Sequence, residues 1–281
     1  MKLSRQVKLY PNKTMKRVLD SLCDYRRYCW NEALACWNDQ YEARLIGLPE
    51  TLLGKLKNKT EGLTDEEQGL VNQYPSPSHY SVRDELTERK EDWQYTLSSR
   101  VLHQAVKDLT TAWELFFKNQ DTAGKPTFKT RKAPKQGFKT DRARIHNGQL
   151  LLDKPHGYHG QWKTIRFKGL SIPDGKITLC SVTRMNGRYL ATFTLEVGPT
   201  PLPRTSQKTA VDANVDHFNT TEGRTTLKPD ILNSLYTRVL HYQRILARKR
   251  HRNPRAIHSK GYRATRAKLQ RTYERIAHIQ K

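Results

Sequence analysis

Residues 176–197 read Lys-Ile-Thr-Leu-Cys-Ser-Val-Thr-Arg-Met-Asn-Gly-Arg-Tyr-Leu-Ala-Thr-Phe-Thr-Leu-Glu-Val and decide the class of the fold. Apolar and polar side chains alternate on both sides of Asn186-Gly187, a dipeptide typical of a two-residue hairpin turn. The same period of two recurs in short segments at 128–132, 137–140, 144–152 and 164–167. Short strands at such regular spacing predict a small antiparallel β-barrel.

The N-terminal segment fits this barrel, although a long helical stretch separates the two in the chain. Residues 1–10 alternate polar and apolar side chains and end at Pro11-Asn12, as a strand entering a turn does. Apolar residues then repeat at three-and-four spacing from Thr14 to about Arg44, and again from Ser98 to Lys118. We therefore expect a pair of packed helices inserted into the barrel, with residues 47–80 as a surface excursion.

Composition indicates the partner. The chain has 51 Lys and Arg against 27 Asp and Glu, for a net charge of +24 and a pI near 10.0. Bound phosphate usually offsets so large a charge, which favours nucleic acid as the partner. We expect no membrane partner, because no apolar run approaches the roughly 18 to 20 residues of a spanning helix.

The cysteines and the N-terminus suggest a reducing compartment. Cys23, Cys29, Cys36 and Cys180 form no C-x-x-C pair, so we expect buried thiols and no zinc site. The first residues lack the apolar core of a signal peptide. The expected location is therefore the cytoplasm, in association with the bacterial nucleoid.

The last segment combines short strands with a basic helical pair. Lys208 to Val215 is an apolar strand that bears Asp212, a second strand follows at His217, and Pro229 precedes a helical stripe that starts at Ile231. Another helix is expected from about Gly261. From Pro229 to the last residue there are fourteen Lys and Arg against two acids.

Five ordered motifs together resemble a known family. They are Leu9-Tyr-Pro-Asn, Tyr28-Cys-Trp-Asn-Glu-Ala-Leu, Ala112-Trp-Glu-Leu-Phe-Phe-Lys, Gly124-Lys-Pro-Thr-Phe-Lys-Thr-Arg-Lys and Val211-Asp-Ala-Asn-Val-Asp-His-Phe. In sequence and spacing they resemble TnpB, the transposon-encoded RNA-guided nuclease related to the type V CRISPR effectors. The resemblance extends over the whole chain.

The resemblance implies an α+β multidomain fold. Residues 1–12 and 122–200 would form a wedge barrel of OB-like type, and residues 13–121 the inserted helical recognition lobe. Residues 201–207 would be a linker, and residues 208–281 a truncated RNase H-like domain of the RuvC type.

Departures from the family pattern suggest that nuclease activity is lost. By resemblance Asp212 is the first metal ligand, but nothing after Lys281 supplies the second and third carboxylates or the C-x-x-C zinc ribbon. Glu222 and Glu274 are poor substitutes, because one lies at a turn and the other on a basic helix. We expect Asp212 to be vestigial, with no catalytic residue, no zinc and no catalytic magnesium, since one aspartate cannot hold two metal ions.

The expected function is RNA-guided DNA binding without cleavage, as in the TnpB-derived nuclease-dead repressors called TldR. The protein would need a guide RNA, bind matched double-stranded DNA beside a short flanking motif, and repress transcription by occupying a promoter. By position in the family, the resemblance assigns base-edge contacts in that motif to Tyr80, Arg100 and His103, whose aromatic and bidentate side chains can contact base edges in the major groove. The nucleic-acid-binding residues are expected to be Lys125, Lys129, Arg131, Lys132, Lys135, Lys139, Arg142, Arg144, Arg244, Arg248, Lys249, Arg250 and Arg252.

Aromatic side chains divide into two expected groups. Phe128 and Phe138 lie within the first basic cluster and could stack on unpaired bases. The remaining large rings are expected in the core: Trp30, Trp37, Trp93, Trp113, Phe116 and Phe117.

Two other functions fit the same residues. One is an active RNA-guided endonuclease whose C-terminal part is missing from this polypeptide. The other is a basic nucleic-acid-binding protein that uses no guide. A homodimer is also an open option, because a partial RuvC-type domain would expose sheet edge and apolar helix surface.

Overall fold

The computed structural model describes residues 2–58, 62–169, 172, 175–198, 208, 210–213, 217–221, 225–227 and 231–280. The chain divides into two compact units, Met1–Pro199 and Thr200–Lys281. Within the described ranges, no helix has the length and apolar character needed to cross a membrane.

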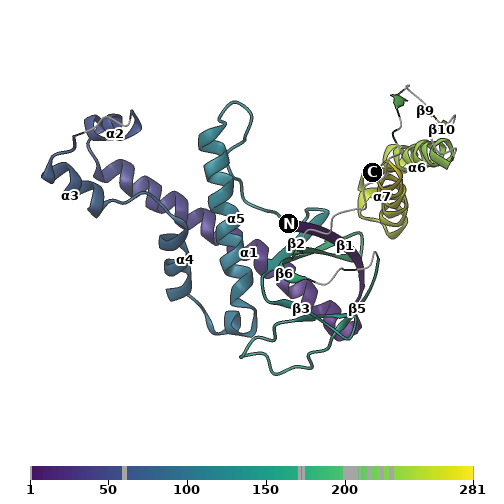
Figure 1. Cartoon of the computed structure of the whole chain (residues 1–281), viewed down its shortest axis with the longest axis horizontal. Coiled ribbons are helices and arrows are strands. Elements are labelled where there is room, and N and C mark those ends of the chain that lie inside the picture. Colours follow the sequence, from purple (N-terminus) through teal and green to yellow (C-terminus); the bar gives the residue numbers. More distant parts are fainter. Residues whose placement is uncertain are drawn as a thin grey trace. The chain divides into compact units, whose positions relative to one another are not determined.

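The strands of the first unit form one antiparallel sheet that curls into a nearly closed barrel (Figure 1). Its order is β2-β6-β7-β1-β5-β4-β3. The strand from the N-terminus lies at the centre of that order, paired with β7 on one side and β5 on the other. The predicted α+β class and antiparallel barrel are confirmed. The strands are β1 (Lys2–Tyr10), β2 (Lys135–Thr140), β3 (Ala143–His146), β4 (Gln149–Leu152), β5 (Ile165–Gly169), β6 (Lys176–Met185) and β7 (Arg188–Glu196).

Two Asn-Gly pairs make the tight hairpins of the barrel. Asn186 and Gly187, between β6 and β7, have φ of 52° and 72°, and Asn147 and Gly148, between β3 and β4, have φ of 47° and 68°. Two consecutive positive φ angles suit asparagine followed by glycine. The segment 144–152 is therefore a hairpin, with β3 and β4 on either side of Asn147-Gly148.

Residues 128–132 do not form the predicted strand. Their backbone is bonded to a helix side chain instead: the Lys129 N–H donates to Asn31 Oδ1 at 2.8 Å, and Asn31 Nδ2 donates to the Lys129 carbonyl at 3.1 Å. Because the Asn31 amide supplies both partners, the alternation of side chains here reflects a loop fixed on a helix.

The helices between β1 and β2 form a lobe around the helix α1 (Lys13–Gly47). The Asn12 side chain caps this helix by accepting from the Met15 N–H at 2.8 Å. Its apolar stripe packs against α5 (Ser99–Lys118), and the same helix contacts β2 and β6, so one core runs from lobe to barrel (Figure 1). The other elements are α2 (Glu50–Lys57), α3 (Asp65–Gln73), α4 (His79–Glu88) and η1 (Asp92–Thr96).

Most of the predicted core side chains are buried. Trp30, Trp37 and Trp113 are buried and Phe116 packs against the core, but Trp93 and Phe117 are exposed, which corrects their assignment. All four cysteines are buried free thiols, as predicted. Burial raises the pKa of Cys23, Cys29, Cys36 and Cys180 to about 12, so these thiols stay protonated.

The second unit contains a three-stranded antiparallel sheet and a helical hairpin. The sheet consists of β8 (Val211–Ala213), β9 (His217–Thr220) and β10 (Thr225–Leu227), and the hairpin of α6 (Ile231–Arg252), η2 (Pro254–His258) and α7 (Lys260–Ile279). Leu232, Leu235, Val239 and Ile276 form the small core of the hairpin. The RuvC-type domain stays a prediction, and the linker 201–207 and Glu222 lie outside the described residues.

Candidate nucleic-acid interface

The loop that carries most of the first basic cluster is fixed on α1. Besides the two Asn31 bonds, Trp30 Nε1 donates to the Thr127 carbonyl at 3.0 Å. Lys125, Arg131, Lys132 and Lys135 are exposed along this loop, and Phe128 is 57% exposed beside them. A rigidly held loop with exposed cations and a free aromatic face suits phosphate contact and base stacking.

The cations on the inner side of this loop converge on one carboxylate. Asp108 on α5 accepts from Arg26 of α1 at 2.8 Å and from Lys139 of β2 at 2.6 Å. Lys129 lies alongside, with Nζ 3.4 Å from the centroid of the Trp30 ring. Lys129 and Lys139, predicted from sequence, are thus brought together, and Arg26 joins them from a helix that the charge count did not single out.

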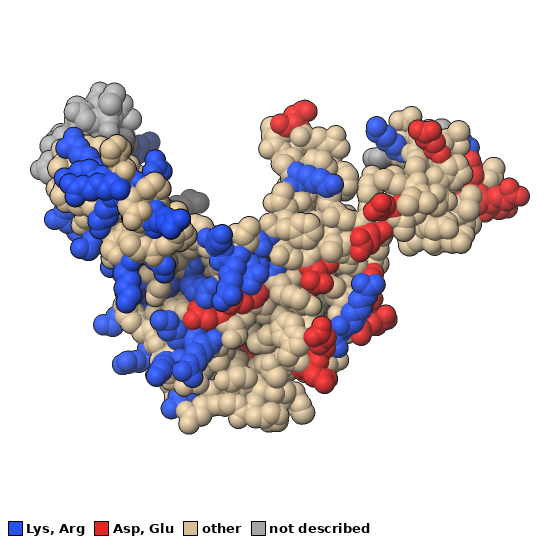
Figure 2. Space-filling view, turned by 180° about the vertical axis from the view of Figure 1, so that it is seen from behind, with Lys and Arg blue, Asp and Glu red and all other residues tan. Residues whose placement is uncertain are grey.

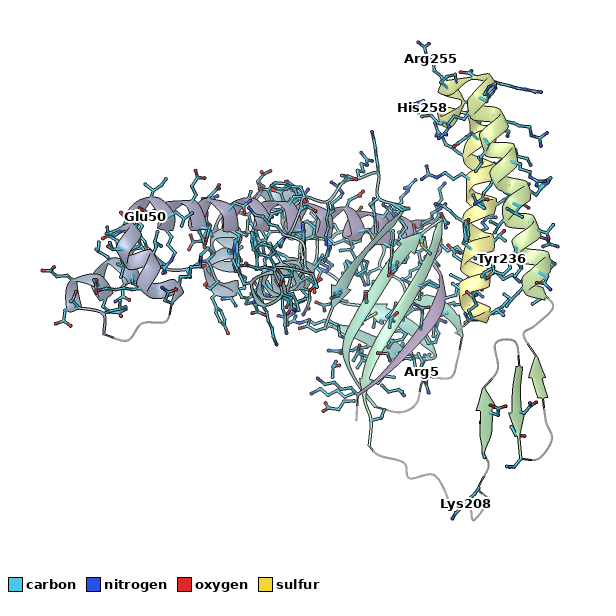
Figure 3. The ribbon with its side chains drawn as sticks, turned by 90° about the horizontal axis from the view of Figure 1, so that it is seen from above. Arg5, Glu50, Lys208, Tyr236, Arg255 and His258 are labelled. Carbon is cyan, nitrogen blue, oxygen red and sulfur yellow. The ribbon has the colours of Figure 1, made fainter. Side chains whose placement is uncertain are left out.

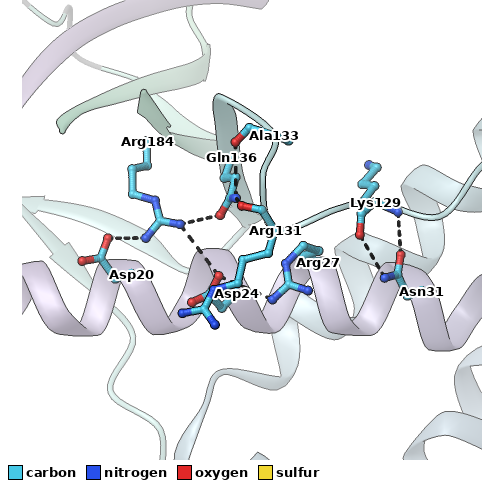
Figure 4. Close-up of polar contacts among 9 residues, drawn as sticks. All are labelled: Asp20, Asp24, Arg27, Asn31, Lys129, Arg131, Ala133, Gln136 and Arg184. Carbon is cyan, nitrogen blue, oxygen red and sulfur yellow. Dashed lines mark hydrogen bonds and ion pairs between the residues drawn. The ribbon is translucent and has the colours of Figure 1, made fainter. Parts of the chain in front are cut away.

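A second network joins α1 to the barrel next to the loop (Figure 4). Arg184 on β6 donates to Asp20 at 2.6 Å and to the Gln136 side chain, and it lies 3.8 Å from Asp24. Gln136 in turn donates to the Arg131 carbonyl at 2.7 Å, which fixes the second end of the loop. Sequence reasoning missed this network, since its main pair is 164 residues apart.

A cleft at the barrel extends the basic surface. It has a volume of about 1020 Å³, and its wall includes Arg142 and Arg144, as well as Lys168 and Lys176, which the sequence prediction omitted. Asp141 and Asp153 also line it, and Arg142 lies 3.7 Å from the Asp153 carboxylate, so only part of this charge is free for a polyanion. Phe167, Ile177 and Leu195 form its apolar part. Phe138 is 2% exposed and belongs to the core, so its predicted stacking on bases is wrong: its position in β2 points it into the barrel.

The three residues assigned to the flanking motif differ in their surroundings. Tyr80 is 67% exposed, with the Arg83 guanidinium 5.2 Å from its ring centroid. The Arg100 guanidinium donates to both oxygens of Asp141, with Nε 2.7 Å from Oδ1. These donors are therefore used within the protein and are not free to contact a base. Burial lowers the pKa of His103, and the nearby cation Arg100 lowers it further.

The second basic cluster lies on the helical hairpin. Arg244, Arg248, Arg250 and Arg252 are exposed on α6. Lys249 instead bonds the Gly261 carbonyl at 3.1 Å and Thr265 Oγ1 at 3.3 Å, and so joins the two helices. Figure 2 shows Lys and Arg gathered on this hairpin and over the barrel, while Asp and Glu lie mostly over the helical lobe.

The turn of the hairpin is also basic. Arg255 and His258 lie at the η2 end, away from Tyr236 near the start of α6 (Figure 3). Tyr236 accepts from Gln280 at 3.0 Å and closes the opposite end of the hairpin. The exposed arginines of α6 therefore lie on a hairpin whose two helices are joined by side-chain hydrogen bonds at both ends.

Asp212 lies on β8, opposite Asn219 of β9. Among the described residues, no three His, Cys, Asp or Glu side chains gather in a way that could hold a metal ion. Each unit therefore carries its own basic surface suited to polyanions: the anchored loop and the cleft in the first unit, and the helical hairpin in the second.

A comparison with protein families indicates DNA binding independently of these clusters. Residues 1–45 match the family model HTH_OrfB_IS605, described as a helix-turn-helix domain. Such a domain is typical of TnpB and of proteins associated with IS605 OrfB transposases, and it implies DNA binding. In this chain the matched residues fold as β1 followed by the single long helix α1. No curated protein matches the sequence.

Proposed function

We propose that this chain is an RNA-guided DNA-binding protein of the TnpB type. It binds a guide RNA and matched double-stranded DNA beside a short flanking motif, and occupancy of a promoter represses transcription. The observation that carries the proposal is the basic loop 124–135, which α1 of the family-matched segment holds in place through Trp30 and Asn31.

The physical demands of this function suit the surface. In RNA-guided recognition, base pairing reads the target sequence, and the protein holds the heteroduplex in a basic channel and reads only the flanking motif. Exposed Arg131, Lys132 and Lys135 can contact the backbone, and exposed Phe128 can stack on an unpaired base. Tyr80 is the best placed of the three residues assigned to the flanking motif, because Arg100 is already paired with Asp141.

We further propose that these 281 residues bind DNA without cutting it. The support is the resemblance: of the carboxylates that it assigns to the metal site, Asp212 is the one present in this sequence. Two-metal cleavage needs several carboxylates around the ions, whereas guided binding needs none.

The test begins with the RNA that copurifies with the protein. A guide binder should enrich one structured RNA with a variable end, and a DNA duplex that matches that end should bind at least tenfold tighter than a duplex with the matching bases scrambled. Equal affinity for both duplexes would favour the guide-independent alternative.

Cleavage is tested on the same complex. With magnesium added, the matched duplex should stay intact, and the Asp212→Ala protein is the matched control. Strand scission that requires magnesium and disappears in Asp212→Ala would establish the nuclease alternative instead.

A further inference from the structure

Lys129 is half-buried, whereas the other cations of the anchored loop are exposed. It comes between α1 and β2, beside the Arg26–Asp108–Lys139 cluster, with its ammonium against the Trp30 ring. We propose that Arg26, Lys129 and Lys139 form a binding site for one backbone phosphate of a nucleic acid. The proposal rests on the nucleic-acid binding proposed above.

The charges of this cluster are not balanced within the protein. Three cations from three elements surround one carboxylate, and the two oxygens of Asp108 are used by Arg26 and Lys139. Within the part of the chain that the structure describes, no carboxylate lies within ion-pair distance of Lys129, whose Nζ faces the Trp30 ring at 3.4 Å. The site therefore has an excess of positive charge that a bound anion would offset.

The titration of Lys129 agrees with this geometry. Burial lowers the pKa of Lys129 to about 8, with Arg26 and Lys139 lowering it further and Asp108 raising it. These are the charged groups that face the ammonium from α1, β2 and α5. A phosphate would act as Asp108 does and raise the pKa, so that binding and protonation support each other.

The surroundings favour a nucleic-acid phosphate over other anions. The loop backbone at Thr127 and Lys129 is already held by Trp30 and Asn31, so the site is preformed and loses little freedom on binding. Phe128, the neighbour of Lys129, is exposed and can stack on a base attached to the same backbone. The guanidinium of Arg26 adds a planar donor suited to phosphate.

The proposal predicts how affinity depends on pH. At pH 7 a lysine with a pKa near 8 is mostly protonated, and at pH 9 it is mostly neutral, so phosphate binding must take up a proton. If the bound form stays protonated, affinity should fall about tenfold from pH 7 to pH 9, because the protonated fraction of free Lys129 falls from about 0.9 to about 0.1. Ordinary lysines, with pKa near 10.4, change little over this range.

The experiment measures the affinity of a short dye-labelled DNA duplex for the full chain at pH 7 and pH 9, at constant salt. The unchanged protein should bind about tenfold more weakly at pH 9. Lys129→Arg should bind at both pH values with less than a twofold difference, because arginine stays charged. Lys129→Gln should bind at least tenfold more weakly than the unchanged protein at pH 7, with less than a twofold difference between pH 7 and pH 9.

Lys132→Gln is the matched control, since it removes the same charge from the exposed part of the same loop. It should weaken binding while keeping the tenfold pH dependence. Tryptophan emission checks the fold of each variant, and the loop should stay in place because Trp30 and Asn31 bond its backbone and not the Lys129 side chain.

Three results would overturn the inference. If the unchanged protein binds with no pH dependence, or if Lys129→Arg keeps the tenfold effect, the phosphate site is wrong while the proposed function stands. If the unchanged protein binds no duplex at either pH, both the site and the proposed function fail.

Discussion

Replacing Arg184 with methionine should destabilise the unit of residues 1–199 by about 2 kcal/mol. Arg184 joins β6 of the barrel to α1, with a 2.6 Å bond to Asp20 and a second bond to Gln136 (Figure 4). Tyr189 donates to the same oxygen of Asp20 at 2.5 Å, so the carboxylate would keep one partner. Methionine has a similar volume but no charge. The loss of stability in Arg184→Met should therefore come from the lost hydrogen bonds and not from lost packing.

The magnitude follows from the exposure of the two charged groups. A hydrogen bond to a charged group contributes about 1.5 to 3 kcal/mol, and a neutral one about 1 kcal/mol. The side chains of Arg184 and Asp20 are 25% and 35% exposed, so solvent screens the pair and the lower end of the range applies. Both bonds involve the charged Arg184 guanidinium, and with each reduced to about 1 kcal/mol by solvent screening they contribute about 2 kcal/mol together.

Urea denaturation followed by tryptophan fluorescence measures this loss in the right unit. All five tryptophans lie within residues 1–199, at positions 30, 37, 93, 113 and 162. With a slope of about 2 kcal/mol per molar urea, the midpoint should fall by about 1 M.

A double-mutant cycle with Asp20→Asn separates the pair from general effects. The two changes together should cost less than their sum by at least about 0.5 kcal/mol, as expected for residues in contact. An unchanged urea midpoint in Arg184→Met, or strict additivity with Asp20→Asn, would refute the reasoning.

Three further outcomes test the interface. Changing Arg248, Lys249 and Arg250 together to glutamine should lower the log–log salt slope of DNA binding by about 2, measured by salt titration, because Lys249 is engaged inside the hairpin; an unchanged slope would place the cluster away from the backbone. Asp212→Ala should leave DNA affinity and repression unchanged, and a tenfold loss would show that this carboxylate matters. Since the pKa of His103 is lowered on folding, the unfolded chain binds more protons below pH 7; the first unit should lose stability from pH 7 to pH 5, and His103→Gln should reduce that loss in urea melts.

The barrel could be predicted because its signals are local. Each strand alternates within itself, and Asn186-Gly187 and Asn147-Gly148 fix their hairpins through their own backbone angles. The long helices could also be predicted from the sequence, because the apolar stripe of each one repeats within a single segment and indicates which face is buried. That β1 belongs to the barrel was inferred only because a lone strand needs a sheet, and the structure confirms it; its central place in the sheet was not predicted.

The remaining features depend on contacts between distant segments. Residues 128–132 alternate as a strand does, but Asn31, 98 residues earlier, takes their backbone bonds and makes them a loop. The excursion of residues 47–80 contains α2 and α3, and α3 is fixed by a capping box between Thr64 and Glu67. That signal was present in the sequence, but the acidic, Gly- and Pro-containing composition of the segment obscured it.

Charge illustrates the same limit for the candidate site. A count of lysines and arginines treats every cation alike, yet the fold pairs Lys139 with Asp108 and Arg100 with Asp141, while Arg131 and Lys132 stay exposed. A paired cation must give up or share its carboxylate before it contacts a phosphate, so it contributes less to binding than an exposed one. The affinity of this surface for nucleic acid should therefore depend on which acids lie near each cation. Lys129 lies beside Asp108, whose two oxygens already bind Arg26 and Lys139, so we expect a bound phosphate to stabilise the Lys129 ammonium more than it stabilises a paired cation.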